Sequence, residues 1–155
     1  MIPIIIPAYE PDQRLIGLLK ELSEYPYGPV ILVNDGSGSA YEDIFKTAKN
    51  LLSEKAILLT HEVNRGKGRA LKTAFQYILE HLPKAIGAVT ADSDGQHTKK
   101  SIMNVAEMML QNQEDLILGV RTFDKENIPW KSRFGNRLTE KVFTYVAGVH
   151  ISDTQ

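Results

Sequence analysis

Five short runs of apolar residues alternate with four segments of helical periodicity along this chain. The runs are continuously apolar and rich in β-branched side chains, which is typical of strands whose sheet is covered by helices on both faces. Strand–helix alternation implies right-handed crossovers and a mostly parallel sheet. We therefore expect an α/β, Rossmann-like fold of three layers, with strands at residues 4–6, 30–33, 56–59, 85–89 and 116–118.

The segments between these runs place apolar side chains on one face of a helix. After the fifth run the pattern changes to a polar stretch at residues 121–130 and a basic amphipathic stretch at residues 131–146. The four inward faces are expected to carry Leu15, Leu18, Leu19 and Leu22; Ile44, Ala48, Leu51 and Leu52; Ala70, Ala74, Tyr77 and Ile78; and Ile102, Val105, Ala106 and Met109.

Composition restricts the class of protein. The chain has 155 residues, of which 43% are hydrophobic and 24% charged, and residues 1–155 are expected to form a single domain. A formal net charge of -1 gives no global attraction to nucleic acid. The absence of cysteine excludes disulfides and thiolate metal sites.

No apolar run approaches the roughly 20 residues of a membrane helix, and the pattern of residues 1–7 predicts a strand rather than a signal peptide. We expect a cytoplasmic protein. The apolar face of residues 131–146 either packs on the sheet, which is the more common arrangement, or rests against the inner face of the cell membrane.

Three polar loops follow predicted strands, at residues 7–10, 34–38 and 92–97. Ligands of open α/β sheets bind beyond the carboxyl ends of the strands, where these loops are expected to meet. The composition of the loops therefore indicates what the site binds.

Asp92 and Asp94 flank one serine at the end of a buried strand. Like charges this close repel unless a cation lies between them, and carboxylate oxygen suits Mg²⁺ or Mn²⁺. Gln96 and His97 could add a ligand or a phosphate contact. The alternative is a helix N-cap, with Asp94 or Thr98 capping a helix that begins near Lys99.

Two further loops carry weaker signals. Asp35 is placed to accept a hydrogen bond from the N–H of a base, although Asp-Gly after a strand is also a common turn. Residues 64–70 set two glycines and three cations before a helix, where exposed N–H groups attract anions. The spacing is neither that of a P-loop nor that of a dinucleotide fingerprint, and a solvated basic turn is the alternative. His61, His81 and His150 are assigned no role.

Four motifs in order resemble the family 2 glycosyltransferases of the GT-A fold: residues 5–10 (IIPAYE), 33–37 (VNDGS), 64–70 (NRGKGRA) and 92–97 (DSDGQH). The resemblance is closest to the branch of dolichyl-phosphate mannose synthase and the bacterial polyprenyl-phosphate glycosyltransferases. It covers nearly the whole chain and implies the N-terminal part of a GT-A domain, truncated at its C-terminus. The sequence departs from the commonest pattern with Glu10 in place of Asn and Asn34 in place of Asp.

The resemblance also implies a role for each motif. Asp35 would contact the base, the segment Gly66, Lys67 and Gly68 would close over the nucleotide, and Asp92 would complete its pocket. Mg²⁺ or Mn²⁺ would lie on Asp92, Asp94 and Gln96. The acceptor phosphate would bind Arg121 and Arg133, which share the catalytic role with Asp94. The remaining nucleotide pocket would consist of Pro7, Ala8, Tyr9 and Glu10.

These roles predict an inverting glycosyltransferase. The donor would be a nucleoside-diphosphate sugar, with a UDP-sugar favoured over a GDP-sugar, and the acceptor a lipid-linked polyprenyl phosphate at a membrane surface. Nucleic acid is not expected as a partner. Two alternatives remain open: a non-catalytic nucleotide-binding module of the same fold, and a nucleotidyltransferase, which also uses paired aspartates.

Overall fold

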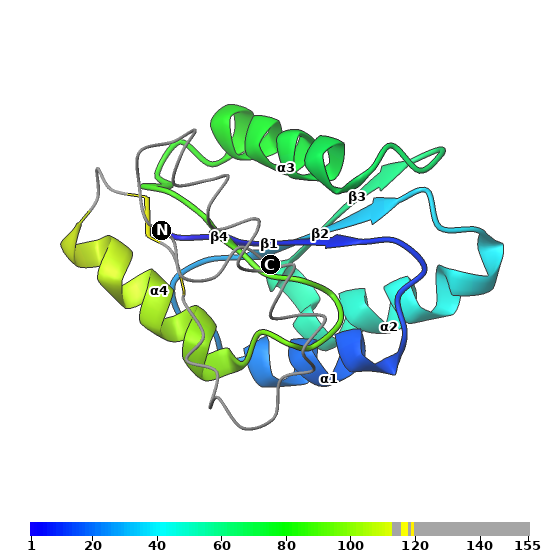
Figure 1. Ribbon diagram of the computed structural model, residues 1–155, viewed down its shortest axis with the longest axis horizontal. Helices are drawn as coiled ribbons and strands as arrows, with labels where there is room; N and C mark the ends of the chain where they lie inside the picture. The colour runs from blue at the N-terminus through cyan, green and yellow to red at the C-terminus, as the bar shows by residue number, and fades with distance from the viewer. Residues whose placement is uncertain (113–115, 118, 120–155) are drawn as a thin grey trace, which may run out of the picture. The chain divides into compact units, whose positions relative to one another are not determined.

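The computed structural model describes residues 1–112, 116–117 and 119, and residues 1–117 form one compact unit. Within these residues, four parallel strands form a sheet in the order β3-β2-β1-β4 (Figure 1). The strands are β1 (Ile4–Ala8), β2 (Val30–Asp35), β3 (Ala56–His61) and β4 (Val89–Thr90). The helices are α1 (Gln13–Leu22), α2 (Glu42–Leu52), α3 (Lys67–His81) and α4 (Lys99–Gln111), with short 3₁₀ turns at Ser39–Tyr41 and Ser53–Lys55.

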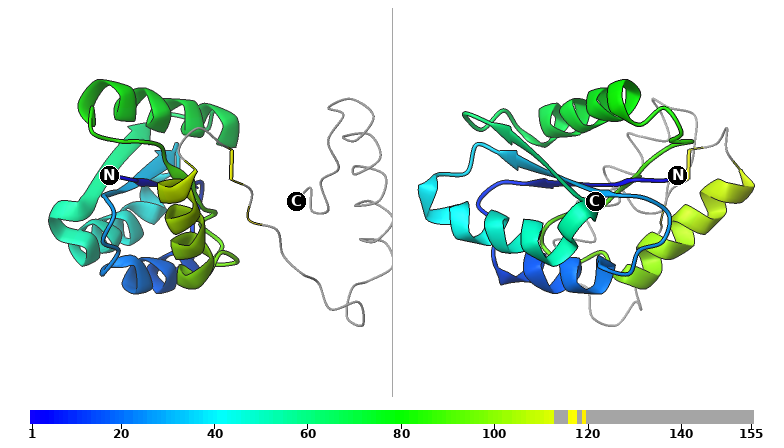
Figure 2. Two further views of the ribbon diagram at one scale, coloured as in Figure 1. Left: turned by 90° about the vertical axis from the view of Figure 1, so that its left-hand side faces the viewer. Right: turned by 180° about the vertical axis from the view of Figure 1, so that it is seen from behind.

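Helices cover both faces of the sheet, which confirms the expected three-layer α/β fold. Figures 1 and 2 show α3 alone on one face and α1, α2 and α4 on the other. Side chains of each strand alternate between the two faces. Ile4 and Ile6 of β1 enter the core beneath α1, α2 and α4, whereas Ile5 joins Ala70 and Ala74 in the core beneath α3. Both sides of the strand are buried, which explains why its sequence is continuously apolar.

The predicted helical faces are largely confirmed. Leu15, Leu18, Leu19 and Leu22 of α1 are all buried, and so are Ala48 and Leu52 of α2. Phe45, which is absent from the predicted face, is buried on the same side of α2. The other residues of the predicted faces are buried or partly buried against the same two cores: Ile44, Leu51, Ala70, Ala74, Tyr77, Ile78, Ile102, Val105, Ala106 and Met109.

The fourth strand is shorter than the predicted range of residues 85–89 and lies later in the chain. Only Val89 and Thr90 pair with β1. The amides on either side, those of Ile86 and Ala91, also donate to carbonyls of the N-terminal segment, at 3.0 and 2.9 Å. Pro3 limits the ladder, because its carbonyl accepts from Val89 but it has no N–H to donate in return.

The fifth predicted strand, at residues 116–118, is not found at 116–117, where the backbone is not in a strand, and residue 118 lies outside the described residues. No helix among the described residues is both long and apolar enough to cross a bilayer.

Candidate nucleotide-sugar site

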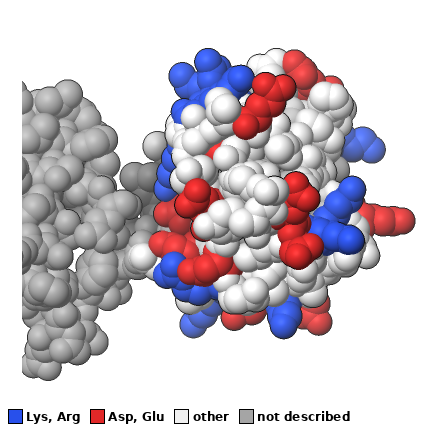
Figure 3. Space-filling view, turned by 90° about the vertical axis from the view of Figure 1, so that its right-hand side faces the viewer, with Lys and Arg blue, Asp and Glu red and all other residues white. Residues whose placement is uncertain are grey.

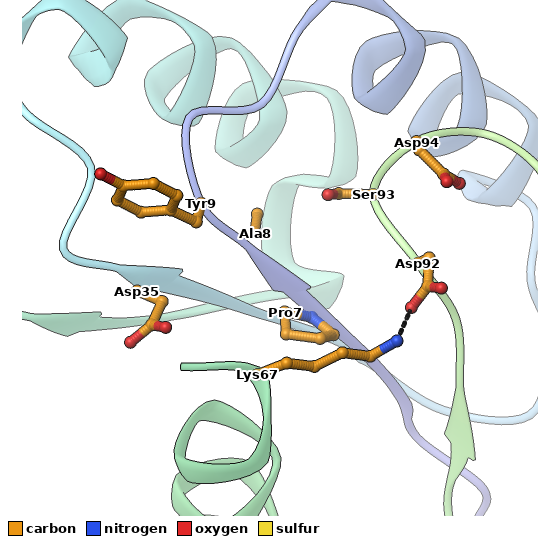
Figure 4. A pocket seen from close by; sticks show the side chains of 8 residues that line it. All are labelled: Pro7, Ala8, Tyr9, Asp35, Lys67, Asp92, Ser93 and Asp94. Carbon is orange, nitrogen blue, oxygen red and sulfur yellow. Dashed lines mark hydrogen bonds and ion pairs between the residues drawn. The ribbon is translucent and has the colours of Figure 1, made fainter. Parts of the chain in front are cut away.

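A cavity of about 270 Å³ opens at the carboxyl ends of the strands (Figure 4). This is close to the lower end of the range for small-molecule sites. Three of the predicted loops and the start of α3 meet there, as the strand order requires. Its lining consists of Pro7, Ala8, Tyr9, Asp35, Lys67, Asp92, Ser93 and Asp94.

Most of the predicted nucleotide-binding residues therefore lie around one cavity. Glu10, Gly66 and Gly68 are close in the chain to lining residues but do not line it. Figure 3 looks onto the side of the molecule where these loops lie, and acidic side chains there flank an uncharged centre. An anionic ligand at this side would need compensating cations.

Asp35 is the most buried charged group of the site, with 3% of its surface exposed. Its Oδ1 accepts from His61 Nδ1 at 2.6 Å and from the Arg65 amide at 3.0 Å. Burial raises the pKa of the Asp35 carboxyl, but the hydrogen bonds from His61 and from the Arg65 amide outweigh it and hold the pKa below its ordinary value. Asp35 is thus an ionised, hydrogen-bond-accepting group at the edge of the cavity.

Residues after β1 and β2 hold each other in place. Ser37 Oγ accepts from the Glu10 amide, and the Ser37 amide donates to Asn34 Oδ1, each at 2.9 Å. Glu10 has a positive φ of 48°, a conformation that asparagine adopts more readily than glutamate. Tyr9 beside it is 48% exposed and lines the cavity, and Figure 4 shows its ring on the Asp35 side, directed away from Ser93 and Asp94. The two departures from the family pattern therefore lie outside the cavity lining, Glu10 in the loop after β1 and Asn34 near the end of β2.

Asp92 and Asp94 both line the cavity, but the chain turns at residues 93–94 instead of staying extended. Asp92 Oδ1 pairs with Lys67 Nζ at 2.5 Å, which links the loop after β4 to the start of α3 (Figure 4). Asp94 Oδ1 accepts from the Gln96 amide at 3.0 Å, in a turn that the positive φ of Gly95 (73°) permits.

Of the two residues predicted as alternative caps of α4, Thr98 is the one that caps the helix. Thr98 precedes α4, and its hydroxyl accepts from the Ser101 amide. Asp94 does not cap the helix, so its carboxylate lines the cavity instead. His97 Nδ1 accepts from the Asp92 amide at 2.9 Å, which leaves the ring proton on Nε2. This hydrogen bond stabilises the turn between Asp92 and His97.

His61 is the residue that sequence reasoning missed. Its neighbours in the sequence suggest no role, yet it is 9% exposed and lies between Asp35 and Thr73. A signal is present, because β2 and β3 both read as four apolar residues, one polar residue and then Asp35 or His61. Aligning the apolar runs places these two residues side by side, which is the register that the structure shows.

Arg121 and Arg133, predicted to bind the acceptor phosphate, lie outside the described residues, as does the amphipathic stretch at residues 131–146.

Replacing Asp35 with asparagine is expected to destabilise the fold by about 1–3 kcal/mol at pH 7. Because the folded-state pKa of Asp35 lies below its ordinary value of 3.8, the ionised carboxylate adds stability above that value. This contribution is lost as the pH falls through the folded-state pKa. Urea unfolding of both proteins from pH 7 to pH 3 should show a difference in their free energies of unfolding that becomes smaller below about pH 4. If this difference in free energy stays constant over the range, Asp35 does not have a lowered pKa in the folded protein.

Comparison with known proteins places the chain in a family. Residues 4–151 match the model of glycosyl transferase family 2. The uncharacterized protein MJ1222 of Methanocaldococcus jannaschii is 31% identical over 98% of this chain and 60% of its own length. The UDP-N-acetylglucosamine--dolichyl-phosphate N-acetylglucosaminyltransferase of Methanococcus voltae is 28% identical over 100% of this chain and 66% of its own length.

More distant relatives agree. The undecaprenyl-phosphate 4-deoxy-4-formamido-L-arabinose transferase of Aeromonas hydrophila is 23% identical over 99% of this chain and 46% of its own length. The crystal structure of Staphylococcus aureus TarS, residues 1–349, shares the fold with a TM-score of 0.57 at 22% identity, over 83% of this chain and 38% of that one. This chain thus spans roughly half to two thirds of the length of these curated relatives. The match over residues 4–151, together with a cavity built from the motifs that suggested it, shows that the chain belongs to glycosyl transferase family 2.

Proposed function

We propose that this chain carries the donor site of an inverting glycosyltransferase that moves a sugar from a nucleoside-diphosphate sugar to a polyprenyl phosphate. The observation that carries the proposal is the single cavity that joins a buried carboxylate, a lysine at a helix start and a pair of aspartates. These are the groups needed at the base, the phosphates and the metal of such a donor. The names of the Methanococcus and Aeromonas relatives, which act on dolichyl or undecaprenyl phosphate, support the choice of acceptor.

The base is proposed to lie at the Asp35 end of the cavity. An ionised carboxylate accepts hydrogen bonds and cannot donate them, so it suits a base that presents a ring N–H. The exposed ring of Tyr9 offers a surface for stacking. A UDP-sugar is favoured as donor, in line with the printed name of the Methanococcus relative, and a GDP-sugar is the second choice.

The diphosphate is proposed to lie between the start of α3 and the loop after β4. The first amides of α3 and the Lys67 ammonium supply positive charge on one side. Lys67 is paired with Asp92, and 61% of its side chain is exposed. A ligand phosphate or a cation on Asp92 would compete for one partner of this pair, so Lys67 can pass from carboxylate to phosphate as the donor binds.

The loop after β4 fits a divalent cation held partly by the donor. Among the described residues no cluster of three or more acidic or histidine side chains is placed to hold a metal. Two carboxylates with phosphate oxygens and water are the usual surroundings of Mg²⁺ at a nucleotide. Asp92 and Asp94 would hold Mg²⁺ or Mn²⁺, with Gln96 as a further candidate ligand. The bound ion supplies Lewis-acid compensation for the charge that develops on the leaving diphosphate.

The acceptor end of the reaction needs no general base if the attacking oxygen belongs to a phosphate, which is already anionic. Such an oxygen would attack the anomeric carbon from the face opposite the diphosphate, with inversion. Arg121 and Arg133 stay proposed as the residues that position it, at a membrane surface where a lipid-linked phosphate lies.

A transfer assay tests the proposal. The chain should transfer radiolabelled sugar from a UDP-sugar to a short polyprenyl phosphate with Mn²⁺ and release UDP. Release of pyrophosphate from UTP and a sugar 1-phosphate would instead identify a nucleotidyltransferase. Tight nucleotide binding with no transfer, by this chain and by a version extended to the length of its relatives, would identify a binding module.

A further inference from the structure

Two buried side chains and one half-buried side chain, from three different elements, form a continuous hydrogen-bonded chain beside the cavity. Asp35 ends β2, His61 ends β3, and Thr73 lies in the second turn of α3. His61 Nδ1 lies 2.6 Å from Asp35 Oδ1, and His61 Nε2 lies 2.9 Å from Thr73 Oγ1. The side chains of His61 and Asp35 are only 7% and 4% exposed. Solvent therefore has little access to the bond between His61 and Asp35.

The carboxylate of Asp35 determines which atom donates in its bond with His61. An ionised carboxylate has only acceptor atoms, so the proton between Asp35 and His61 belongs to Nδ1. In the neutral form of His61 with its proton on Nδ1, Nε2 is an acceptor and the Thr73 hydroxyl donates a hydrogen bond to it. The chain then runs Thr73 to His61 to Asp35, with every donor pointing toward the carboxylate.

These bonds also fix the direction of the carboxylate. Asp35 Oδ1 accepts from both His61 and the Arg65 amide, so rotation of the group would break two bonds at once. The same residue lines the cavity. A group that lines a binding cavity and is held from behind in one protonation state and one orientation is suited to reading the hydrogen-bonding pattern of a ligand.

We propose that His61 and Thr73 are positioning residues that keep Asp35 as a fixed, acceptor-only reader of the base, and so select uracil against cytosine. This inference rests on the proposed donor site. Uracil presents an N–H at ring position 3, whereas cytosine presents a lone pair there, which an ionised carboxylate repels. Without His61, burial favours the protonated acid, which can donate to the cytosine nitrogen. Loss of the histidine should therefore reduce selectivity as well as affinity.

The test measures binding of UDP and CDP by calorimetry, with Mn²⁺, for wild type and variants. Wild type should prefer UDP by about 100-fold, because the wrong base leaves a buried group unpaired. His61→Ala should weaken UDP binding by about 10- to 100-fold and bring the two nucleotides within about tenfold of each other. His61→Asn, whose amide N–H can replace that of Nδ1, should recover most of the selectivity.

Two further variants separate positioning from simple structural support. Thr73→Val, which removes the donor to Nε2, should lower the UDP-to-CDP ratio by a few-fold, while Thr73→Ser should keep it. His81→Ala is the matched histidine control, because His81 lies on α3 stacked on Tyr77, away from the network. If His61→Ala does not fold, the Asn and Thr73 variants decide the question.

The outcomes are distinct. A folded His61→Ala with the wild-type ratio of UDP to CDP affinity overturns the positioning role and leaves the donor site intact. If His61→Ala is unfolded, a Thr73→Val with the wild-type ratio of UDP to CDP affinity overturns the proposal as well, because the hydrogen bond from Thr73 to His61 then contributes nothing to selectivity. Failure of wild type to bind any nucleoside diphosphate removes the donor site and this inference with it.

Discussion

Gly36→Ala is expected to destabilise the protein by about 3–5 kcal/mol, enough to lower its melting temperature by about 10 °C. Gly36 has a φ of 75°, and a Cβ there would lie 2.1 Å from the carbonyl carbon of Val63 and 2.3 Å from the amide nitrogen of Asn64. Both are backbone atoms, so a side-chain rotation cannot relieve the overlap. The loop that precedes α3 must move, and with it the Arg65 amide that holds Asp35.

The control for this substitution is close by in the sequence. A Cβ added at Gly38 would meet no atom within 4 Å, and the φ of Gly38 is an ordinary negative one, so Gly38→Ala should change stability by no more than about 0.5 kcal/mol. Thermal unfolding followed by circular dichroism measures both. Equal melting temperatures for Gly36→Ala and wild type would show that the two loops do not approach as described.

Asp94→Asn is expected to weaken Mn²⁺-dependent binding of UDP by about 100-fold, because a neutral amide is a poor ligand for a hard cation. Asparagine keeps an Oδ1 that can accept from the Gln96 amide, so the turn should survive. The residual binding without metal, which we assign to Asp35 and Lys67 in the proposed donor site, should change little. Calorimetry with and without Mn²⁺ separates the two components.

An aspartate away from the cavity provides the matched control. Asp43 lies in the first turn of α2 and is exposed, and Asp43→Asn should leave both components of binding unchanged. If Asp94→Asn binds UDP with the same metal dependence as wild type, Asp94 is not a metal ligand.

The arrangement of strands and helices could be predicted because hydrophobic periodicity determines which face of each element is buried. The same logic predicted that the loops around Tyr9, Asp35 and Asp94 would meet, since parallel strands end at one edge. Hydrophobic periodicity predicted a fourth strand that is longer than the one observed, because an apolar run does not reveal whether the neighbouring strand can form every hydrogen bond of the ladder. Pro3, close to the N-terminus, prevents that.

Hydrophobic periodicity cannot predict which side chains of distant loops form hydrogen bonds or ion pairs with each other. Lys67 and Asp92 lie 25 positions apart in different elements, and nothing in either motif indicates the other. The partnership of Asp35 with His61 was within reach, because the register of two matched strands specifies it. It is missed when each histidine is judged by its neighbours in the sequence rather than by its place in the sheet.

Calorimetric titration of the wild-type chain with UDP, in the presence and absence of Mn²⁺, tests the donor site most directly. Micromolar or tighter binding that strengthens with Mn²⁺ is the predicted result, with GDP weaker than UDP. No heat of binding with either nucleotide, from a chain whose circular dichroism shows it to be folded, would contradict the assignment of the cavity at Asp35, Lys67 and Asp92 to a nucleotide.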